Sequence, residues 1–139
     1  MASERTLCII KPDAVEKRKA GAILQHLLDQ GFEVLGMRQL LLSQRAAEGF
    51  YAVHRERPFF KDLCEFMTRS PVVVLALARE NAVQHLRSVI GATDPAKADA
   101  GTIRKLYGAS LGENAVHGSD SVDNGRIECA YYFQGSELG

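Results

Sequence analysis

The sequence predicts an α/β sandwich in which an antiparallel sheet is covered by helices. The chain has 139 residues, which is the size of one domain and enough to bury a core without disulfides or metals. Short apolar runs of strand length alternate along it with amphipathic segments of helix length. The resulting order is β-α-β-α-α-β-α-loop-β-α, which favours the split βαβ, ferredoxin-like type.

The first third of the chain predicts two strands and the helix between them. Residues 5–11 are a short apolar run that stops at Pro12 and predicts a strand. A helix follows, and Gly31 is placed to end it. Its apolar face consists of Ile23, Leu24, Leu27 and Leu28. Residues 32–42 predict a strand with apolar side chains on both faces, which suits either a sheet edge paired across a two-fold axis or a strand buried within one subunit.

Two helices are predicted in the middle of the chain. Ser43 is a candidate N-cap for a helix that ends near Val53, and Pro58 suits the first turn of the next one. The apolar residues between Phe59 and Met67 span an arc of roughly 160°, which is wider than the ~100° stripe that one core contact requires. Part of this second helix is therefore expected to face something other than the core.

The remaining elements follow the same logic. Residues 71–78 are apolar on both faces and predict a central strand. Asn81 and Gln84 form a candidate capping box for a helix that ends at Gly91. Next come a loop at residues 92–101, a short helix at 102–107, an irregular stretch at 108–113, a brief strand from Val116 and a last helix at 121–133. Gly125 lies inside that last helix at a cost of ~1 kcal/mol relative to alanine.

Composition and charge exclude several classes of function. Lys+Arg and Asp+Glu both number 17, so no overall basic field exists to bind nucleic acid or an anionic membrane. The N-terminus lacks a secretory signal, and no apolar run is long enough to span a bilayer. The three cysteines, Cys8, Cys64 and Cys129, are widely spaced among apolar residues and predict buried, reduced thiols in a cytoplasmic protein.

Several polar residues occupy segments that do not need them for folding. The chain has no P-loop, no GxGxxG turn and no metal-ligand spacing, so a zinc site is not expected. Three cations, a hydroxyl, a histidine and a carboxylate nevertheless suggest a phosphate-handling set: Lys11, Arg87, Arg104, Thr93, His117 and Glu128. Each has an ordinary reading, since His117 could be a turn residue or a metal ligand and the cations could be solvated side chains. A carboxylate near an imidazole would fix its tautomer.

The stretch NAVHGSD at residues 114–120 resembles the active-site signature N-x-x-H-G-S-D of nucleoside diphosphate kinases. The resemblance extends over almost the whole chain, through residues 4–15, 48–60, 71–77, 91–107 and 117–122. It implies a ferredoxin-like fold over one domain at residues 1–139. It also implies transfer of the γ-phosphate of a nucleoside triphosphate to a nucleoside diphosphate through a phosphohistidine, with Mg²⁺ carried by the nucleotide phosphates rather than by protein side chains.

The resemblance also implies a role for each site residue. His117 would be the nucleophile, which suits a neutral imidazole because its ordinary pKa is near 6.5. Ser119 and Glu128 would support it, and Tyr51 would stand beside the phosphate path. The phosphate-binding residues would be Lys11, Arg87, Thr93 and Arg104, with Lys11 and Asn114 also reaching the ribose 3′-hydroxyl. Phe59 would stack on the base in a slot lined by Leu63 and Leu111, which predicts broad base and sugar specificity.

The alternative is a catalytically silent ferredoxin-like module that binds nucleotide or nucleic acid. Intact His117, Lys11 and Glu128 favour the enzyme, because a pure binding module needs no nucleophile. The chain departs from the family at a few positions, including Ser70 where glycine is frequent, Leu111, Gly125, Ala100 and the basic residues 17–19. Ala100 and the short C-terminal segment are typical of bacterial members. The two apolar faces of the strand at 32–42 lead us to expect a homo-oligomer built from dimers, and the short C-terminal segment favours a tetramer over a hexamer.

Overall fold

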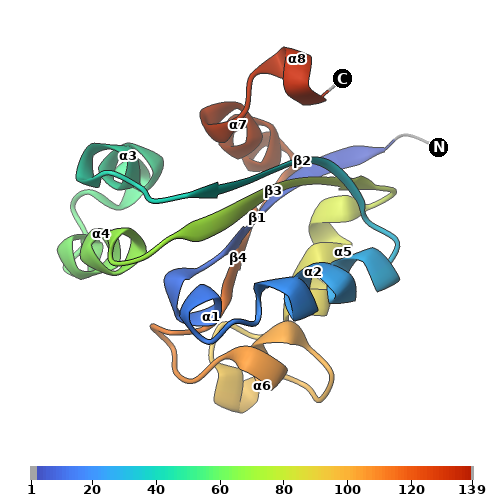
Figure 1. Cartoon of the computed structure of the whole chain (residues 1–139), viewed down its shortest axis with the longest axis horizontal. Coiled ribbons are helices and arrows are strands. Elements are labelled where there is room, and N and C mark those ends of the chain that lie inside the picture. The colour runs from blue at the N-terminus through green and yellow to red at the C-terminus, as the bar shows by residue number, and fades with distance from the viewer. Residues whose placement is uncertain (1–2, 139) are drawn as a thin grey trace.

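The computed structural model describes residues 3–138 and shows a sheet with helices on both faces (Figure 1). Within these residues the strands form one four-stranded sheet in the order β2-β3-β1-β4, and every neighbouring pair is antiparallel. This is the strand order of the split βαβ arrangement, so the predicted fold class is confirmed.

The strands and helices of the described residues have the following bounds. The strands are β1 (Glu4–Ile10), β2 (Glu33–Leu40), β3 (Val72–Arg79) and β4 (Val116–Gly118). The helices are α1 (Pro12–Glu16), α2 (Ala20–Asp29), α3 (Gln44–Phe50), α4 (Phe60–Thr68), α5 (Ala82–Ile90), α6 (Ile103–Tyr107), α7 (Val122–Tyr132) and α8 (Gly135–Leu138). Single 3-10 turns occupy Ala52–His54 and Pro95–Lys97.

Alternation along the two central strands divides the core into two layers. Cys8 and Ile10 of β1 pack with residues of α1, α2, α5 and α6, whereas Leu7 and Ile9 pack with residues of α4, α7 and α8. β3 lies between β2 and β1 and is buried along seven of its eight residues, as its two apolar faces predict. Figure 1 shows the two groups of helices on opposite sides of the sheet.

Most predicted helix ends are confirmed. Gly31 follows α2 with φ +85°, and the Ser43 hydroxyl accepts a hydrogen bond from the Ala46 N–H as the N-cap of α3. Thr102 and Ser121 cap α6 and α7 in the same way. The three cysteines all lie among the described residues and are free and buried, as predicted.

Three local predictions are wrong. The Asn81 side chain caps nothing: Asn81 has φ +55°, and the Val83 N–H instead donates to the Glu4 carboxylate at 3.3 Å. Pro58 lies before α4 rather than in its first turn, because Phe59 is the N-cap. The α3 helix ends at Phe50, and a separate 3-10 turn follows at Ala52–His54. The single helix predicted to end near Val53 is therefore two elements. The short helices α1 and α8 were not predicted.

Gly125 has a packing role that its helix position conceals. A Cβ at this position would lie 2.6 Å from the Arg5 carbonyl oxygen, so α7 can approach β1 only because residue 125 has no side chain. Glu128 lies three residues further along the same helix and therefore faces the sheet as well. The close approach at Gly125 is thus one of the features that positions Glu128.

Candidate active site

A cleft of about 920 Å³ opens beside β4 and brings most of the predicted site residues together. Its lining includes Lys11, Tyr51, Phe59, Leu63, Thr93, Arg104, Leu111, Asn114, His117 and Glu128. Arg87 lines a second cavity of about 270 Å³, which shares Thr93, Arg104 and Gly118 with the first. Ser119 is buried and contacts the cleft residues from behind.

Strand register determines the direction of the His117 side chain. His117 lies opposite Ile9 in the antiparallel β1–β4 pair, and directly opposed residues point to the same face of a sheet. Ile9 packs in the layer that contains α7, so His117 faces that layer too. There its Nε2 lies 2.9 Å from the Glu128 Oε1.

A chain of hydrogen bonds holds the Glu128 carboxylate in place. The Ser119 hydroxyl donates to Glu128 Oε1 at 2.7 Å and accepts from the Leu7 N–H of β1 at 3.0 Å. The carboxylate is therefore fixed to the central sheet, and its contact with Nε2 favours the tautomer that carries the proton there. The lone pair of that tautomer lies on Nδ1, the ring nitrogen that remains available for chemistry.

A second chain of hydrogen bonds positions Lys11. The Lys11 ammonium donates to the Asn114 Oδ1 at 2.9 Å, and the Asn114 amide donates to the Thr93 carbonyl at 3.0 Å. Burial, with a smaller contribution from the Arg104 charge, lowers the pKa of Lys11 from 10.5 to about 8. Lys11 thus remains a cation at neutral pH, although it sits in an environment that disfavours its charge.

Arg104 is anchored to the backbone on either side of the cleft. Its two terminal nitrogens donate to the Gly91 carbonyl at 3.1 Å and to the Val116 carbonyl at 2.9 Å. Burial lowers its pKa from the ordinary value, and nearby Arg87 acts in the same direction. Two arginines and a lysine lie close enough for their charges to act on one another, which makes a region suited to a polyanion.

The other end of the cleft is apolar. Phe59 precedes α4 and is 48% exposed, while Leu111 in the loop before β4 is 62% exposed. Leu63 is partly buried between them and the core of the second layer. Large apolar side chains left open to a cleft can cover the flat apolar face of a ligand. This outcome matches the wide apolar arc predicted for α4.

Tyr51 lies at the base of the cleft rather than on its rim. Its ring is buried, and its hydroxyl has no hydrogen-bond partner among residues 3–138. Burial raises the pKa of this phenol well above its ordinary value, so the hydroxyl keeps its proton. The hydroxyl oxygen is itself inaccessible, so the Tyr51 ring forms part of the floor of the cleft.

Phe50 and Asp13 also contribute to the site, and neither was predicted from the sequence. The Phe50 ring meets the His117 ring edge-on, with centroids 5.6 Å apart, and so limits rotation of the imidazole. Asp13 is buried and accepts the Ala115 N–H at 3.0 Å, where Ala115 has the unusual φ of +74°. Phe50 resembled an ordinary core aromatic residue and Asp13 an ordinary first-turn acid, so neither carried a distinguishing signal.

Comparison with known proteins identifies the family. The profile described as "Nucleoside diphosphate kinase" matches residues 4–138. The chain belongs to the nucleoside diphosphate kinase family. A nucleoside diphosphate kinase of Sorangium cellulosum is 61% identical over 99% of this chain and 96% of its own, and that of Geobacter sulfurreducens is 58% identical over 97% and 98%. The predicted bacterial resemblance is confirmed.

Solved structures of nucleoside diphosphate kinases agree with this assignment. The Aquifex aeolicus enzyme is 41% identical, covers 99% of this chain and 100% of its own, and superposes with a TM-score of 0.96. A Halobacterium salinarum enzyme in complex with CDP is 36% identical, with a TM-score of 0.94 and coverage of 99% and 92%. The protein is a phosphotransferase that acts on nucleotides, and the silent binding module is not favoured. No helix among residues 3–138 is long and apolar enough to cross a membrane.

Proposed function

We propose that His117 carries the phosphoryl group between nucleotides. Its Nδ1 lone pair attacks the γ-phosphorus of a nucleoside triphosphate, the bond to the β-phosphate oxygen breaks, and the nucleoside diphosphate leaves with that electron pair. A second nucleoside diphosphate then takes the phosphoryl group by the reverse step. The observation that carries this proposal is the 2.9 Å contact between Glu128 and Nε2, which stabilises the positive ring and leaves Nδ1 facing the cleft.

The cationic end of the cleft would bind the phosphates. Lys11, Arg87 and Arg104 would neutralise the transferring group, Thr93 would donate to a phosphate oxygen, and the buried Tyr51 hydroxyl would stand beside the path. Lys11 and Asn114, already joined at 2.9 Å, would share the ribose 3′-hydroxyl.

Magnesium would enter with the nucleotide. Among the described residues no group of three or more His, Cys, Asp or Glu side chains could hold a metal ion, and the phosphate end of the cleft is cationic. These residues fit Mg²⁺ that is coordinated by phosphate oxygens rather than by protein ligands. When bound there, the ion supplies additional neutralisation of phosphate charge.

The apolar end of the cleft would hold the base. Phe59 and Leu111 would cover the two faces of the ring, with Leu63 beside them. None of these side chains can hydrogen-bond to a base edge, and every base has a face that can stack. The site therefore supports broad base specificity, and sugar contacts confined to the 3′-hydroxyl support use of both ribose and deoxyribose.

The proposal also covers the oligomeric state of the protein and its location in the cell. One edge of β2 pairs with β3, the other pairs with no strand among residues 3–138, and Met37 in this strand is 55% exposed. An edge of this kind supports a homo-oligomer built from dimers, with a tetramer favoured over a hexamer. The match over residues 4–138 supports one kinase domain at residues 1–139, and three free, buried thiols support a cytoplasmic location.

Labelling with γ-³²P-ATP tests the chemistry. The wild-type protein is expected to retain label that is lost in acid and kept in base, because the P–N bond of a phosphohistidine is labile to acid. His117→Ala should abolish labelling and nucleotide exchange while leaving the fold intact. His26→Ala is the control, since His26 lies on α2 in the other layer, and it should label normally. Acid-stable label, or exchange by His117→Ala, would contradict the proposal.

A further inference from the structure

The loop between α6 and β4 forms one wall of the cleft and is largely closed on itself. Residues 110–114 all line the cleft. The N–H groups of Ala109 and Ser110 both donate to the Glu113 carbonyl, at 2.8 and 3.2 Å, and the Glu113 N–H donates to the Ser110 hydroxyl at 3.1 Å. Leu111 at its tip is 62% exposed, so the core does not hold it in place. These hydrogen bonds tie both ends of the loop tip to Glu113.

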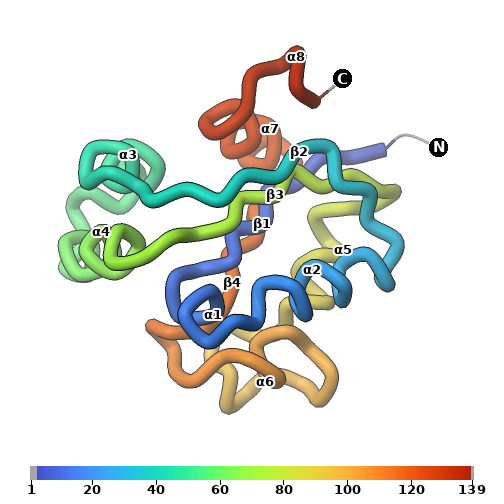
Figure 2. Tube along the Cα trace, viewed as in Figure 1, coloured from blue at the N-terminus to red at the C-terminus, as the bar shows by residue number. Residues whose placement is uncertain are grey.

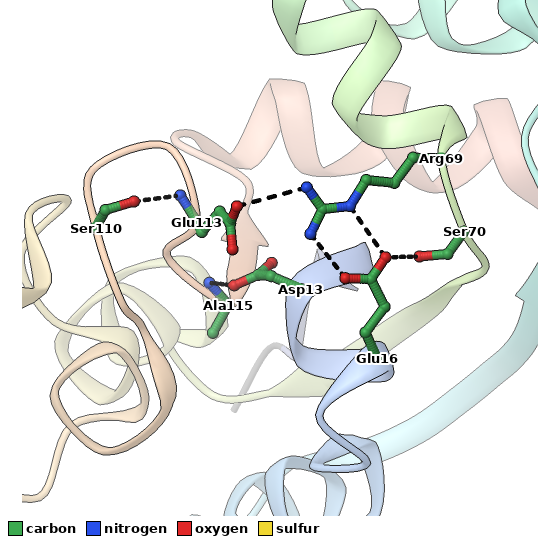
Figure 3. Close-up of polar contacts among 7 residues, drawn as sticks. All are labelled: Asp13, Glu16, Arg69, Ser70, Ser110, Glu113 and Ala115. Atoms are coloured by element: carbon green, nitrogen blue, oxygen red, sulfur yellow. Dashed lines mark hydrogen bonds and ion pairs between the residues drawn. The ribbon is translucent and has the colours of Figure 1, made fainter.

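Arg69, at the end of α4, connects this loop to the rest of the protein (Figure 3). Its Nη1 lies 3.4 Å from the Glu113 Oε2, while Nε and Nη2 donate to the two oxygens of Glu16 at 3.0 and 2.7 Å. Figure 3 shows the guanidinium between the carboxylates of Glu16, which ends α1, and of Glu113. Figure 2 shows the chain from α6 passing close to α1 on its way to β4.

Contacts outside the loop hold the Arg69 guanidinium in place. The bidentate pair with Glu16 sets its plane, and its Cζ lies 4.7 Å from the centroid of the Phe66 ring, which itself lines the cleft. The Ser70 hydroxyl donates to Glu16 at 2.6 Å, which gives a use for a side chain where the family frequently has glycine. Hydrogen bonds from Arg69 and Ser70 lower the pKa of Glu16 to about 2, so the carboxylate stays charged throughout the neutral range.

We propose that Arg69 is a positioning residue for the nucleotide site: through Glu113 it holds the loop of residues 108–113, and with it Leu111, against α1 and α4. The inference rests on the proposed function, in which Leu111 covers one face of the base and Phe59 the other. The distance between these two walls sets how well a base stacks, and Arg69 joins the element after Phe59 to the loop of Leu111. Asn114 is held separately by Lys11 and Thr93, so the phosphate end of the site does not depend on Arg69.

The competing explanation is a solvated surface cluster without functional effect. The paired side chains of Arg69, Glu16 and Glu113 are 39–42% exposed, and exposed ion pairs add little to folding stability. The two explanations differ in what they change. A surface cluster leaves nucleotide kinetics alone, whereas a positioning residue alters KM for substrates that use the base slot.

Arg69→Met separates them, because methionine keeps apolar contact with Phe66 and removes both ion pairs. We expect kcat/KM for ATP and GTP to fall about 5-fold, mainly through a higher KM. Phosphorylation of His117 by phosphoramidate, which has neither base nor sugar, should be unchanged. The matched control is Arg126→Met, which removes an exposed arginine from a 2.7 Å pair with Asp123 on α7 and should leave all of these rates unchanged.

A second variant keeps the test independent of folding. Glu113→Gln removes the charge of Glu113 and reduces the link to the loop to a neutral hydrogen bond, so it should raise KM by a smaller factor than Arg69→Met. Combined with Arg69→Met it should add little, because both changes remove the same link. Equal KM values in wild type, Arg69→Met and Glu113→Gln, or a lowered melting temperature alone, would overturn the inference. Absence of His117 labelling in the wild type would instead overturn the proposed function and the inference with it.

Discussion

Phe59→Ala distinguishes a base-stacking residue from a core residue. Phe59 is 48% exposed, so about half of its surface is in water before any nucleotide binds. Full burial of a phenylalanine contributes roughly 1.5–3 kcal/mol, so removing this half-buried ring should cost roughly 1 kcal/mol of folding free energy. A fully buried phenylalanine would cost ~3–5 kcal/mol.

The loss in nucleotide binding should be larger than the loss in stability. Stacking on an aromatic ring contributes ~1–3 kcal/mol per base. At about 1.4 kcal/mol per tenfold change, KM should rise between about 5-fold and 150-fold. ATP, GTP, CTP and UTP should all be affected by similar factors, with the purines affected slightly more because they have more surface to stack.

The assay measures four KM values and one melting temperature for each protein. Leu106→Ala is the control, because Leu106 on α6 is 53% exposed and lies outside the residues that line the two cavities. It should lower stability to a similar small extent and leave every KM unchanged. If Phe59→Ala melts far below this control and keeps wild-type KM values, Phe59 is a core residue and the base slot lies elsewhere.

Three further predictions concern the catalytic end of the cleft and the helix behind it. Glu128→Gln should lower kcat more than it raises KM, because the charge beside Nε2 is lost while the shape is kept; an unchanged kcat would make Glu128 structural only. In a pH series, kcat/KM should fall as pH rises through about 8, because the Lys11 ammonium then loses its proton and with it the positive charge that binds phosphate. Lys11→Arg should move this fall in kcat/KM to higher pH. A flat wild-type profile to pH 9.5 would contradict the role of Lys11. Gly125→Ala should lower the melting temperature although alanine favours helices by ~1 kcal/mol, because its Cβ would lie 2.6 Å from the Arg5 carbonyl; a raised melting temperature would refute this packing argument.

The pattern of apolar residues correctly predicted the strands and helices whose buried faces follow from that pattern alone. β3 is apolar at its first seven positions because both of its faces are covered, and that pattern alone placed it centrally in the sheet. The capping box at Asn81 failed because Asn81 has φ +55° and not the extended backbone of an N-cap, while a carboxylate from β1, 79 residues away in sequence, binds the Val83 N–H. Local sequence cannot reveal such a partner, since the contact exists only after the sheet has formed.

The site shows the same division. The motif around His117 and the wide apolar arc of α4 pointed to opposite ends of one cleft, and the structure brings them together. Arg69 carried no signal, because one arginine in an exposed helix end is ordinary until Glu16 and Glu113 are seen on either side of it. Gly125 appeared to be only a cost, since the close approach of β1 is not visible in a helical pattern.

The position of the phosphoryl group on His117 tests most directly which atom is the nucleophile. The hydrogen bond at Nε2 leaves Nδ1 as the ring nitrogen available for chemistry, and His117 lines the cleft. The phosphoenzyme made with ATP would be denatured and digested in base, and ³¹P–¹H correlation spectra of the peptide containing residue 117 would show which ring nitrogen bears phosphorus. We expect phosphorus on Nδ1 of His117. Phosphorus on Nε2, or on any other side chain, would contradict it.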